Sequence, residues 1–319
     1  MHLGLMLPAK PDLSWTLARQ LGVRHVITKA APELTGLPAP SHFQSLKAIR
    51  DRFQEAGLTL YALEGDEFDM SRIKLGLPGA EEDLDQYCQM VENMGRLGLK
   101  VLCYNFMAGV GWYRSRTDLQ ERGGALTSGF DLREVPQHLP LQITPERLWE
   151  NYRRFLERVL PVAEAAGIQL ALHPDDPPVP QLLGYSRIFI HGDAYRKALA
   201  LSTSPSHAIT FCQATFRTMG EDVFALLREF GPRIAFLHFR DVIGTRECFR
   251  ETFHDNGPTD MAELLTLAHR YAPHCLLRPD HTPTMAGESN EKVGYTMQGN
   301  LFAVGYIKGI LDARGIPVD

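Results

Sequence analysis

The chain has 319 residues, of which 44% are hydrophobic and 22% are charged, and its formal net charge is −5. This composition is that of an ordinary globular protein, and the length allows one large domain or two smaller ones. The acidic balance argues against a nucleic-acid partner, because binding to phosphates requires a basic surface. Five cysteines without a CxxC pair indicate a reducing compartment rather than a disulfide framework or a structural zinc knot.

The sequence predicts neither a signal peptide nor a membrane span. The amino-terminal residues do not combine a basic region with a long apolar segment, and no apolar run reaches about 18 residues. We therefore expect a cytoplasmic protein without a membrane partner. The sequence leaves open whether the chain forms a homo-oligomer.

The first third of the chain alternates short apolar runs with segments of helical spacing. Strands are predicted at residues 2–7, 24–28, 58–63 and 100–106. Helices are predicted at residues 14–21, 41–56 and 81–97. Residues 66–79 are predicted to be a loop.

A long stretch at residues 107–143 interrupts this alternation. It carries glycines, prolines, Trp112 and Tyr113. An irregular segment of this length inside a compact domain is usually functional or disordered. We expect a lid or a substrate-binding loop here, and a passive insertion is the alternative.

The alternation resumes at Thr144, which is the predicted N-cap of a helix with Pro145 at its first position and Gly167 after its end. The remaining helices are predicted at residues 193–201, 221–230, 259–271 and 295–313. The remaining strands are predicted at residues 168–172, 208–211, 234–237 and 275–277.

Eight predicted strands thus alternate with eight predicted helices. This alternation is typical of a parallel sheet with crossover helices. Eight units favour a closed (β/α)8 TIM barrel, which would form a single domain over residues 1–319. A doubly wound open sheet is the main alternative, although no GxGxxG follows the first strand to make it a dinucleotide-binding one.

Four consecutive strands are followed by, or end in, residues that can bind a metal: His173, Cys212, His238 and Asp280. In a barrel, adjacent strand ends surround one mouth, so four donors could converge on one ion. Imidazole, thiolate and carboxylate are all donors to divalent transition metals. Each residue alone has an ordinary structural explanation, such as a hydrogen-bonded histidine or a buried cysteine. Their coincidence at matching positions is what favours a metal site.

Two residues close to these donors are candidates for proton transfer. His281 follows Asp280 directly, and a histidine beside a metal ligand can move protons near neutral pH. Tyr295 begins the last predicted helix, and a nearby cation would lower its pKa. The alternative for Tyr295 is an aromatic residue with a packing role.

Arginine and histidine side chains near the strand ends are candidates for substrate binding. Arg240 and Arg278 could each hold a carboxylate in bidentate fashion. Their alternative role is a salt bridge to Asp175, Asp176 or Asp241. His254 is a further candidate, on a loop over the mouth.

At these residues the chain resembles the mannonate dehydratase family. The matching strings are LWENYRRFLERVLPVAEAAGIQLALHPDDPP (148–178), TFC (210–212), FLHFRDV (236–242), RPDH (278–281) and GYTMQGNLFAVGYIKGI (294–310). CYNFM (103–107), followed by Trp112, is also similar to that family. The resemblance covers most of residues 73–315, and HPDDPP is its most specific string.

The resemblance implies a barrel of the xylose isomerase-like type that removes water from D-mannonate to give 2-keto-3-deoxy-D-gluconate. It implies a manganese or iron(II) ion at the positions of His173, Cys212, His238 and Asp280, and catalytic roles for the positions of His281 and Tyr295. The residues expected to bind the sugar acid are Asn105, Trp112, Asp175, Arg240, His254 and Arg278.

The sequence departs from the family pattern at strands one, three and four. Residues 3–8 replace an Arg-Trp-Tyr-Gly-like string, residues 63–67 replace a Glu-Ser-Val/Ile-Pro-Val-like string, and Gly111 stands where an acidic residue is expected before Trp112. The alternatives are therefore a metal-dependent sugar isomerase or epimerase and a sugar-acid-binding barrel without turnover. A trinuclear-metal DNA-repair enzyme on a similar barrel is a remote fourth hypothesis, which the negative net charge disfavours.

Overall fold

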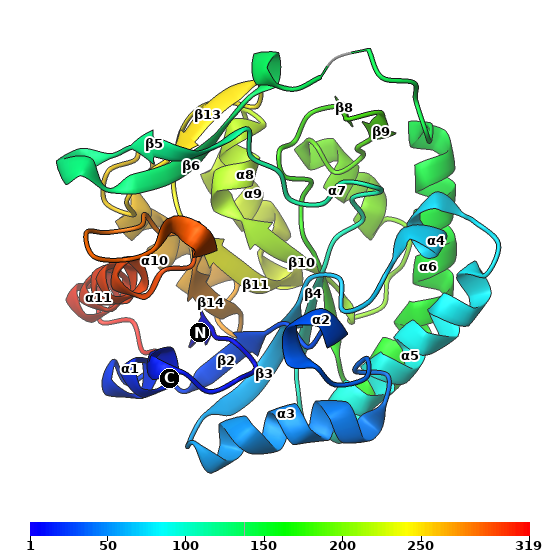
Figure 1. The fold of residues 1–319 in the computed structure, drawn as a ribbon, viewed down its shortest axis with the longest axis horizontal. Coiled ribbons are helices and arrows are strands. Elements are labelled where there is room, and N and C mark those ends of the chain that lie inside the picture. The colour runs from blue at the N-terminus through cyan, green and yellow to red at the C-terminus, as the bar shows by residue number, and fades with distance from the viewer. Residues whose placement is uncertain (137) are drawn as a thin grey trace.

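The computed structural model describes residues 1–136 and 138–319. Eight parallel strands close into a barrel in the order β1-β14-β11-β10-β7-β4-β3-β2, and helices surround it (Figure 1). The barrel strands are β1 (His2–Met6), β2 (His25–Thr28), β3 (Thr59–Glu64), β4 (Val101–Tyr104), β7 (Gln169–Leu172), β10 (His207–Cys212), β11 (Ile234–Phe239) and β14 (Leu276–Pro279). The predicted (β/α)8 barrel is confirmed.

The helices follow the predicted pattern with three short additions, which are α2 (Pro32–Thr35), α4 (Ser71–Leu75) and α8 (Gln213–Thr218) in the described parts of the chain. The other helices are α1 (Leu13–Gln20), α3 (Phe43–Glu55), α5 (Ala80–Arg96), α6 (Pro145–Ala166), α7 (Gly192–Leu199), α9 (Val223–Phe230), α10 (Met261–Tyr271) and α11 (Met297–Ala313). The loop predicted at residues 66–79 contains α4, so that prediction is wrong in part. The five residues of α4 are too few for a helical period to show in the sequence. None of the helices in the described parts of the chain is both long and apolar enough to cross a membrane.

The longest helix, α6, begins and ends where the local chemistry requires. The Thr144 hydroxyl accepts a hydrogen bond from the Arg147 amide, and Pro145 occupies the first helical position. Gly167 ends the helix in the left-handed conformation at φ 67°, which glycine adopts without a steric cost. The caps predicted from the sequence are confirmed.

A second sheet lies over one end of the barrel and was not predicted. Its antiparallel order is β12-β13-β6-β5. Its strands are β5 (Arg116–Gln120), β6 (Leu126–Asp131), β12 (Val242–Thr245) and β13 (Cys248–Glu251). Residues 107–143 are therefore not irregular throughout. The strand β5 is largely exposed and has no apolar alternation, so it becomes a strand only through its pairing with β6. Between β7 and α7, β8 (Gln181–Leu182) and β9 (Tyr185–Ser186) form another small sheet.

Side chains inside the barrel pack separately from the layer between strands and helices. The interior cluster consists of Ile27, Ala62, Val101, Cys103, Ala171, Phe236 and Leu276, all buried. Residues two positions further along a strand point to the same side, because side chains alternate along a strand. The interior cluster therefore fixes which residues at the strand ends face into the mouth.

Candidate active site

The metal-donor residues face the barrel axis because of this alternation. Thr210 and Phe236 lie inside the barrel, so Cys212 and His238, two residues further on, face its mouth. Cys212 and His238 are also register partners on adjacent parallel strands. His173 follows β7, the strand on the other side of β10. Three neighbouring strand ends thus bring one donor each to the same place.

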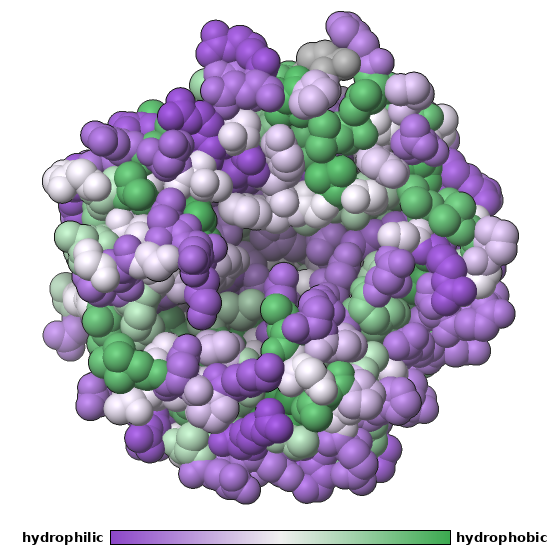
Figure 2. All heavy atoms as spheres, in the orientation of Figure 1, coloured by the Kyte–Doolittle hydropathy of each residue, from purple (hydrophilic) through white to green (hydrophobic). Residues whose placement is uncertain are grey.

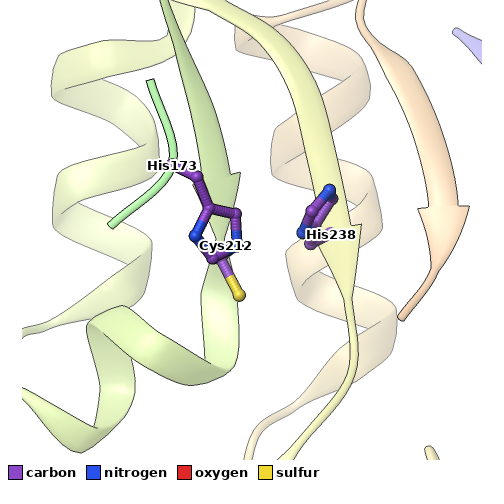
Figure 3. Close-up of side chains that lie close together, drawn as sticks. All are labelled: His173, Cys212 and His238. Atoms are coloured by element: carbon purple, nitrogen blue, oxygen red, sulfur yellow. The ribbon is translucent and has the colours of Figure 1, made fainter. Parts of the chain in front are cut away.

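His173, Cys212 and His238 form a group whose donor atoms all lie within 4.8 Å of one another (Figure 3). His238 is 1% exposed, and neither of its ring nitrogens makes a hydrogen bond with a residue that the structure describes. The Nδ1 atom of His173 lies 2.7 Å from the Pro174 carbonyl oxygen, which leaves Nε2 available. Buried polar groups normally have hydrogen-bond partners, so a ring without one fits a metal ligand. The donor set therefore fits the expected metal.

Asp280 lies beside this group, and it is held by two arginines. Its Oδ2 is 2.7 Å from Arg240 Nε, and its Oδ1 is 3.0 Å from an Arg278 amino group. The same Oδ2 is 3.7 Å from His238 Nδ1 and 3.8 Å from Cys212 Sγ. Burial opposes ionisation, but the surrounding histidines and arginines hold the pKa of Asp280 well below its ordinary value. Asp280 is thus a carboxylate within reach of the donor group.

A cavity of about 220 Å³ opens above these donors. Figure 2, in the orientation of Figure 1, shows a hollow near the centre of the molecular surface. The lining of the cavity comes from six of the strand ends and combines His173, His238 and Asp280 with other polar and aromatic side chains. The lining residues include Lys29, Glu64, Asp66, Asn105, Trp112, His173, Asp176, His238, Arg278, Asp280, His281 and Tyr295.

His281 is oriented by a buried carboxylate of the second sheet. Its Nδ1 lies 2.8 Å from Glu251 Oε1 at the end of β13. Burial disfavours the Glu251 anion, but His281 and two arginines hold its pKa below the ordinary value. An ionised Glu251 can only accept, so Nδ1 of His281 carries a proton, and Nε2 is the acceptor atom of the neutral imidazole. Gly294, at φ +83°, passes so close that a Cβ there would lie 3.0 Å from the His281 ring.

Tyr295 stands next to this histidine. The two rings make an edge contact with centroids 5.3 Å apart, and Trp112 makes a similar contact on His281 at 5.2 Å. Tyr295 as a whole is 38% exposed, but desolvation of its hydroxyl raises the pKa of Tyr295 above its ordinary value, although Arg278 opposes this. Among the groups of the chain itself, desolvation therefore outweighs Arg278, and the lower pKa expected beside a bound metal cation stays a prediction. Tyr295 is a neutral phenol that can donate a proton.

Arg240 does not face the cavity, and its predicted substrate contact is corrected. It is 1% exposed and donates to Asp176, Asp280 and Glu251. Its alternative role, a salt bridge to Asp176, is the one that the structure shows. Arg114 completes the network by pairing with both Asp176 and Glu251. Removing one member of such a buried network leaves its partners uncompensated, so the network holds Glu251 and Asp280 in place.

Two further predicted substrate contacts are corrected in the same way. His254 is fully buried, its Nε2 lies 2.7 Å from the Phe239 carbonyl oxygen, and burial lowers its pKa to about 4. Asp175 is also fully buried and accepts hydrogen bonds from the amides of Ile188 and Phe189. Both side chains hold the backbone behind the mouth through these hydrogen bonds. The sequence placed them correctly near the strand ends but could not show which way they point.

The remaining predicted contacts line the cavity. Arg278 makes a bidentate ion pair with Glu64, with distances of 2.6 and 3.0 Å. Asn105 accepts a hydrogen bond from Lys74 at 2.9 Å. Trp112 is 42% exposed at the rim. Asn105 and Trp112 follow β4, whereas Arg278 lies on β14 beside Asp280 and in register with His238.

Three residues of the site were not singled out from the sequence. Glu251 lies three residues before His254, and the sequence prediction names only that histidine in this segment. Glu64 ends β3 as a buried carboxylate, and a charged residue at the end of an apolar run was the available signal. Lys29 follows β2, is exposed, and passes over Gly65, where a Cβ would lie 2.9 Å from its Cε. No sequence pattern marked Lys29, because its position depends on the loop after β3.

Comparison with known proteins agrees with this architecture. The profile of the D-mannonate dehydratase (UxuA) family matches residues 11–144 and 138–315. The chain belongs to the D-mannonate dehydratase family. This confirms the family resemblance and places the protein among hydro-lyases.

Individual relatives of this family match over most of their length. Mannonate dehydratase of Lachnoclostridium phytofermentans is 31% identical over 307 residues, which cover 82% of this chain and 84% of that protein. The crystal structure of mannonate dehydratase from Streptococcus suis serotype 2 superposes with a TM-score of 0.90 at 26% identity, covering 100% of this chain and 97% of that one. A xylose isomerase domain protein from Planctomyces limnophilus, at 14% identity and a TM-score of 0.62, covers 98% of this chain and 96% of that one and shares the fold. The expected xylose isomerase-like barrel is therefore confirmed.

Proposed function

We propose that this protein is a metal-dependent dehydratase that converts D-mannonate to 2-keto-3-deoxy-D-gluconate and water. The observation that carries the proposal is the convergence of His173, Cys212 and His238 below a cavity lined by His281 and Tyr295. The membership of the mannonate dehydratase family supports the substrate. The five cysteines are all free, which supports a cytoplasmic location.

The proposed cofactor is Mn²⁺ or Fe²⁺, held by His173, Cys212 and His238, with Asp280 as the fourth donor. The unpartnered nitrogens of His238 and the nearby carboxylate fit such an ion. When bound, the ion stabilises the negative charge that develops when a proton leaves the carbon next to a carboxylate.

The proton chemistry is assigned from the protonation states of the two neighbouring rings. The hydrogen bond from Nδ1 to Glu251 leaves Nε2 of His281 as the base for the C2 proton. A phenol keeps its proton at neutral pH, so Tyr295, next to His281, is the acid that protonates the departing C3 hydroxyl. The Arg114–Glu251 ion pair keeps the carboxylate behind His281 ionised.

Further residues that line the cavity position the sugar acid. Asn105, Trp112 and Arg278 are proposed contacts, as expected from the sequence, and Lys29 is added to them. Lys29 is exposed at the rim, and no ion pair of it is seen with the residues that the structure describes. Its ammonium group is therefore free to pair with an anionic oxygen of the substrate.

The experiment is an assay of manganese-loaded protein with D-mannonate, with the 2-keto-3-deoxy acid as the measured product. A panel of other aldonates and uronates tests the substrate, because the strand ends on the Lys29 side differ from the family pattern. Protein stripped of metal with a chelator is the control and should form no product. Absence of product with every aldonate would contradict the proposal.

A further inference from the structure

A second group of metal-donor side chains lies at the opposite end of the barrel. His2 and His25 are the first residues of β1 and β2, whereas the active site lies beyond the last residues of the strands. Asp319 comes from the other end of the chain, and the two ends lie near each other (Figure 1). One donor atom from each of His2, His25 and Asp319 lies within 4.8 Å of the other two.

The backbone holds the three residues in this arrangement. The strands β1 and β2 pair in parallel register, with Gly4 opposite His25. The Leu3 amide donates a 2.9 Å hydrogen bond to the Asp319 carbonyl oxygen, which fixes residue 319 beside β1. The side chains then meet without a long loop having to close, so little conformational entropy remains to be lost when a ligand binds.

The side chains have unused donor capacity. The Nδ1 atom of His25 is buried and has no hydrogen-bond partner among the residues that the structure describes. The Asp319 Oδ1 atom lies 2.7 Å from His2 Nδ1, and the Tyr61 ring packs against both imidazoles at centroid distances of 5.3 and 5.0 Å.

We propose that His2, His25 and Asp319 form a second divalent-metal site of the zinc class. Two imidazoles and one carboxylate are suitable ligands for Zn²⁺, and a water molecule completes four-coordination. A bound ion joins the first two strands of the barrel to residue 319. The ion thereby fastens the segment that follows α11 to the bottom of the barrel.

Cobalt(II) substitution separates this site from the one at the mouth. A Co²⁺ ion at the mouth is bound by the Cys212 thiolate and has a sulfur charge-transfer absorption, whereas an ion bound by His2, His25 and Asp319 has only the weaker d–d bands. Metal-free wild-type protein titrated with Co²⁺ should show both components. Asp319→Asn and His25→Ala should each lose the component without sulfur and retain the sulfur band. Cys212→Ser should show the reverse loss.

Asp319→Asn is the decisive variant, because its side chain is 72% exposed and the amide keeps its shape. Zn²⁺ should raise the melting temperature of Cys212→Ser more than that of Cys212→Ser/Asp319→Asn, since only the former keeps the proposed site. An unchanged cobalt capacity in both Asp319→Asn and His25→Ala would overturn the proposal. An equal zinc shift in the two Cys212→Ser proteins would also overturn it.

Discussion

The two halves of the barrel mouth are built differently. Around the ends of β7, β10, β11 and β14, the polar side chains are buried, and the carboxylates are paired with buried arginines. Around the ends of β2, β3 and β4, Glu64 and Glu67 are also buried, but other polar side chains are more open. Lys29 is exposed there, and Asp66, which pairs with Lys74, is 39% exposed.

The difference indicates which half carries out the reaction and which half determines the substrate specificity. A change at a buried ion pair leaves a charge uncompensated and costs several kcal/mol, so the donor half tolerates little variation. Exposed pairs contribute at most about 1 kcal/mol, so the half near Lys29 can change without loss of the fold. The departures from the family strings at strands three and four fall in this second half. We therefore expect mutations in the two halves to have different effects.

The largest effect is expected for Cys212→Ala in the donor half. Loss of a ligand should reduce metal affinity by more than about 100-fold, since residues that only support ligands already contribute 10- to 100-fold. Metal content after dialysis and turnover of D-mannonate are the measurements. Cys248→Ala, at an exposed cysteine of the second sheet, is the matched control. Full metal content in Cys212→Ala would remove Cys212 from the ligand set.

Tyr295→Phe should lower kcat by about 10²- to 10⁴-fold, because the ring stays in place without its proton. Metal content should be unchanged, which distinguishes this variant from Cys212→Ala. Tyr306→Phe, further along α11 and away from the cavity, is the control and should retain full activity. Normal turnover by Tyr295→Phe would rule out its role as the acid.

Lys29→Met tests the open half of the mouth. The variant keeps most of the side-chain length but loses the charge, so KM should rise by about tenfold, which corresponds to about 1.4 kcal/mol of substrate binding. The value of kcat should change little, because Lys29 is assigned to substrate binding and not to proton transfer. Lys100→Met, which removes an exposed charge just before β4, is the control. A fall in kcat at constant KM would place Lys29 in the reaction instead.

Glu67→Gln should have the smallest effect on turnover, and its effect on stability should depend on pH. Glu67 accepts a 2.6 Å hydrogen bond from the Ala30 amide, next to Lys29, and burial raises its pKa from 4.5 to about 8. The unfolded chain therefore releases this proton first, and wild-type stability falls as the pH rises from about 4.5 to about 8.

The variant lacks this ionisable group and should gain in melting temperature relative to wild type between pH 5 and pH 8. Glu157→Gln, at an exposed carboxyl group of α6, should show no such trend. A constant difference between Glu67→Gln and wild type across this range would show that Glu67 is ionised in the folded protein.

Much of the barrel could be predicted because the sequence signals that specify its strands and helices lie within short segments. Apolar runs with breakers, the Thr144 cap and the Gly167 end are properties of short segments, and each determines the structure near itself. The second sheet could not be predicted in this way. Its strand β13 pairs with β6, more than a hundred residues earlier, and these short strands acquire their structure from that pairing.

The sequence by itself determined the (β/α)8 barrel, the family and the positions of His173, Cys212 and His238 at successive strand ends. Strand alternation explains this, because a residue's place along a strand decides which way its side chain points. Only the tertiary structure decided that Arg240, Asp175 and His254 turn away from the cavity and that Glu251 stands behind His281. These roles depend on which buried charges face one another, and the pairing joins segments far apart in the chain.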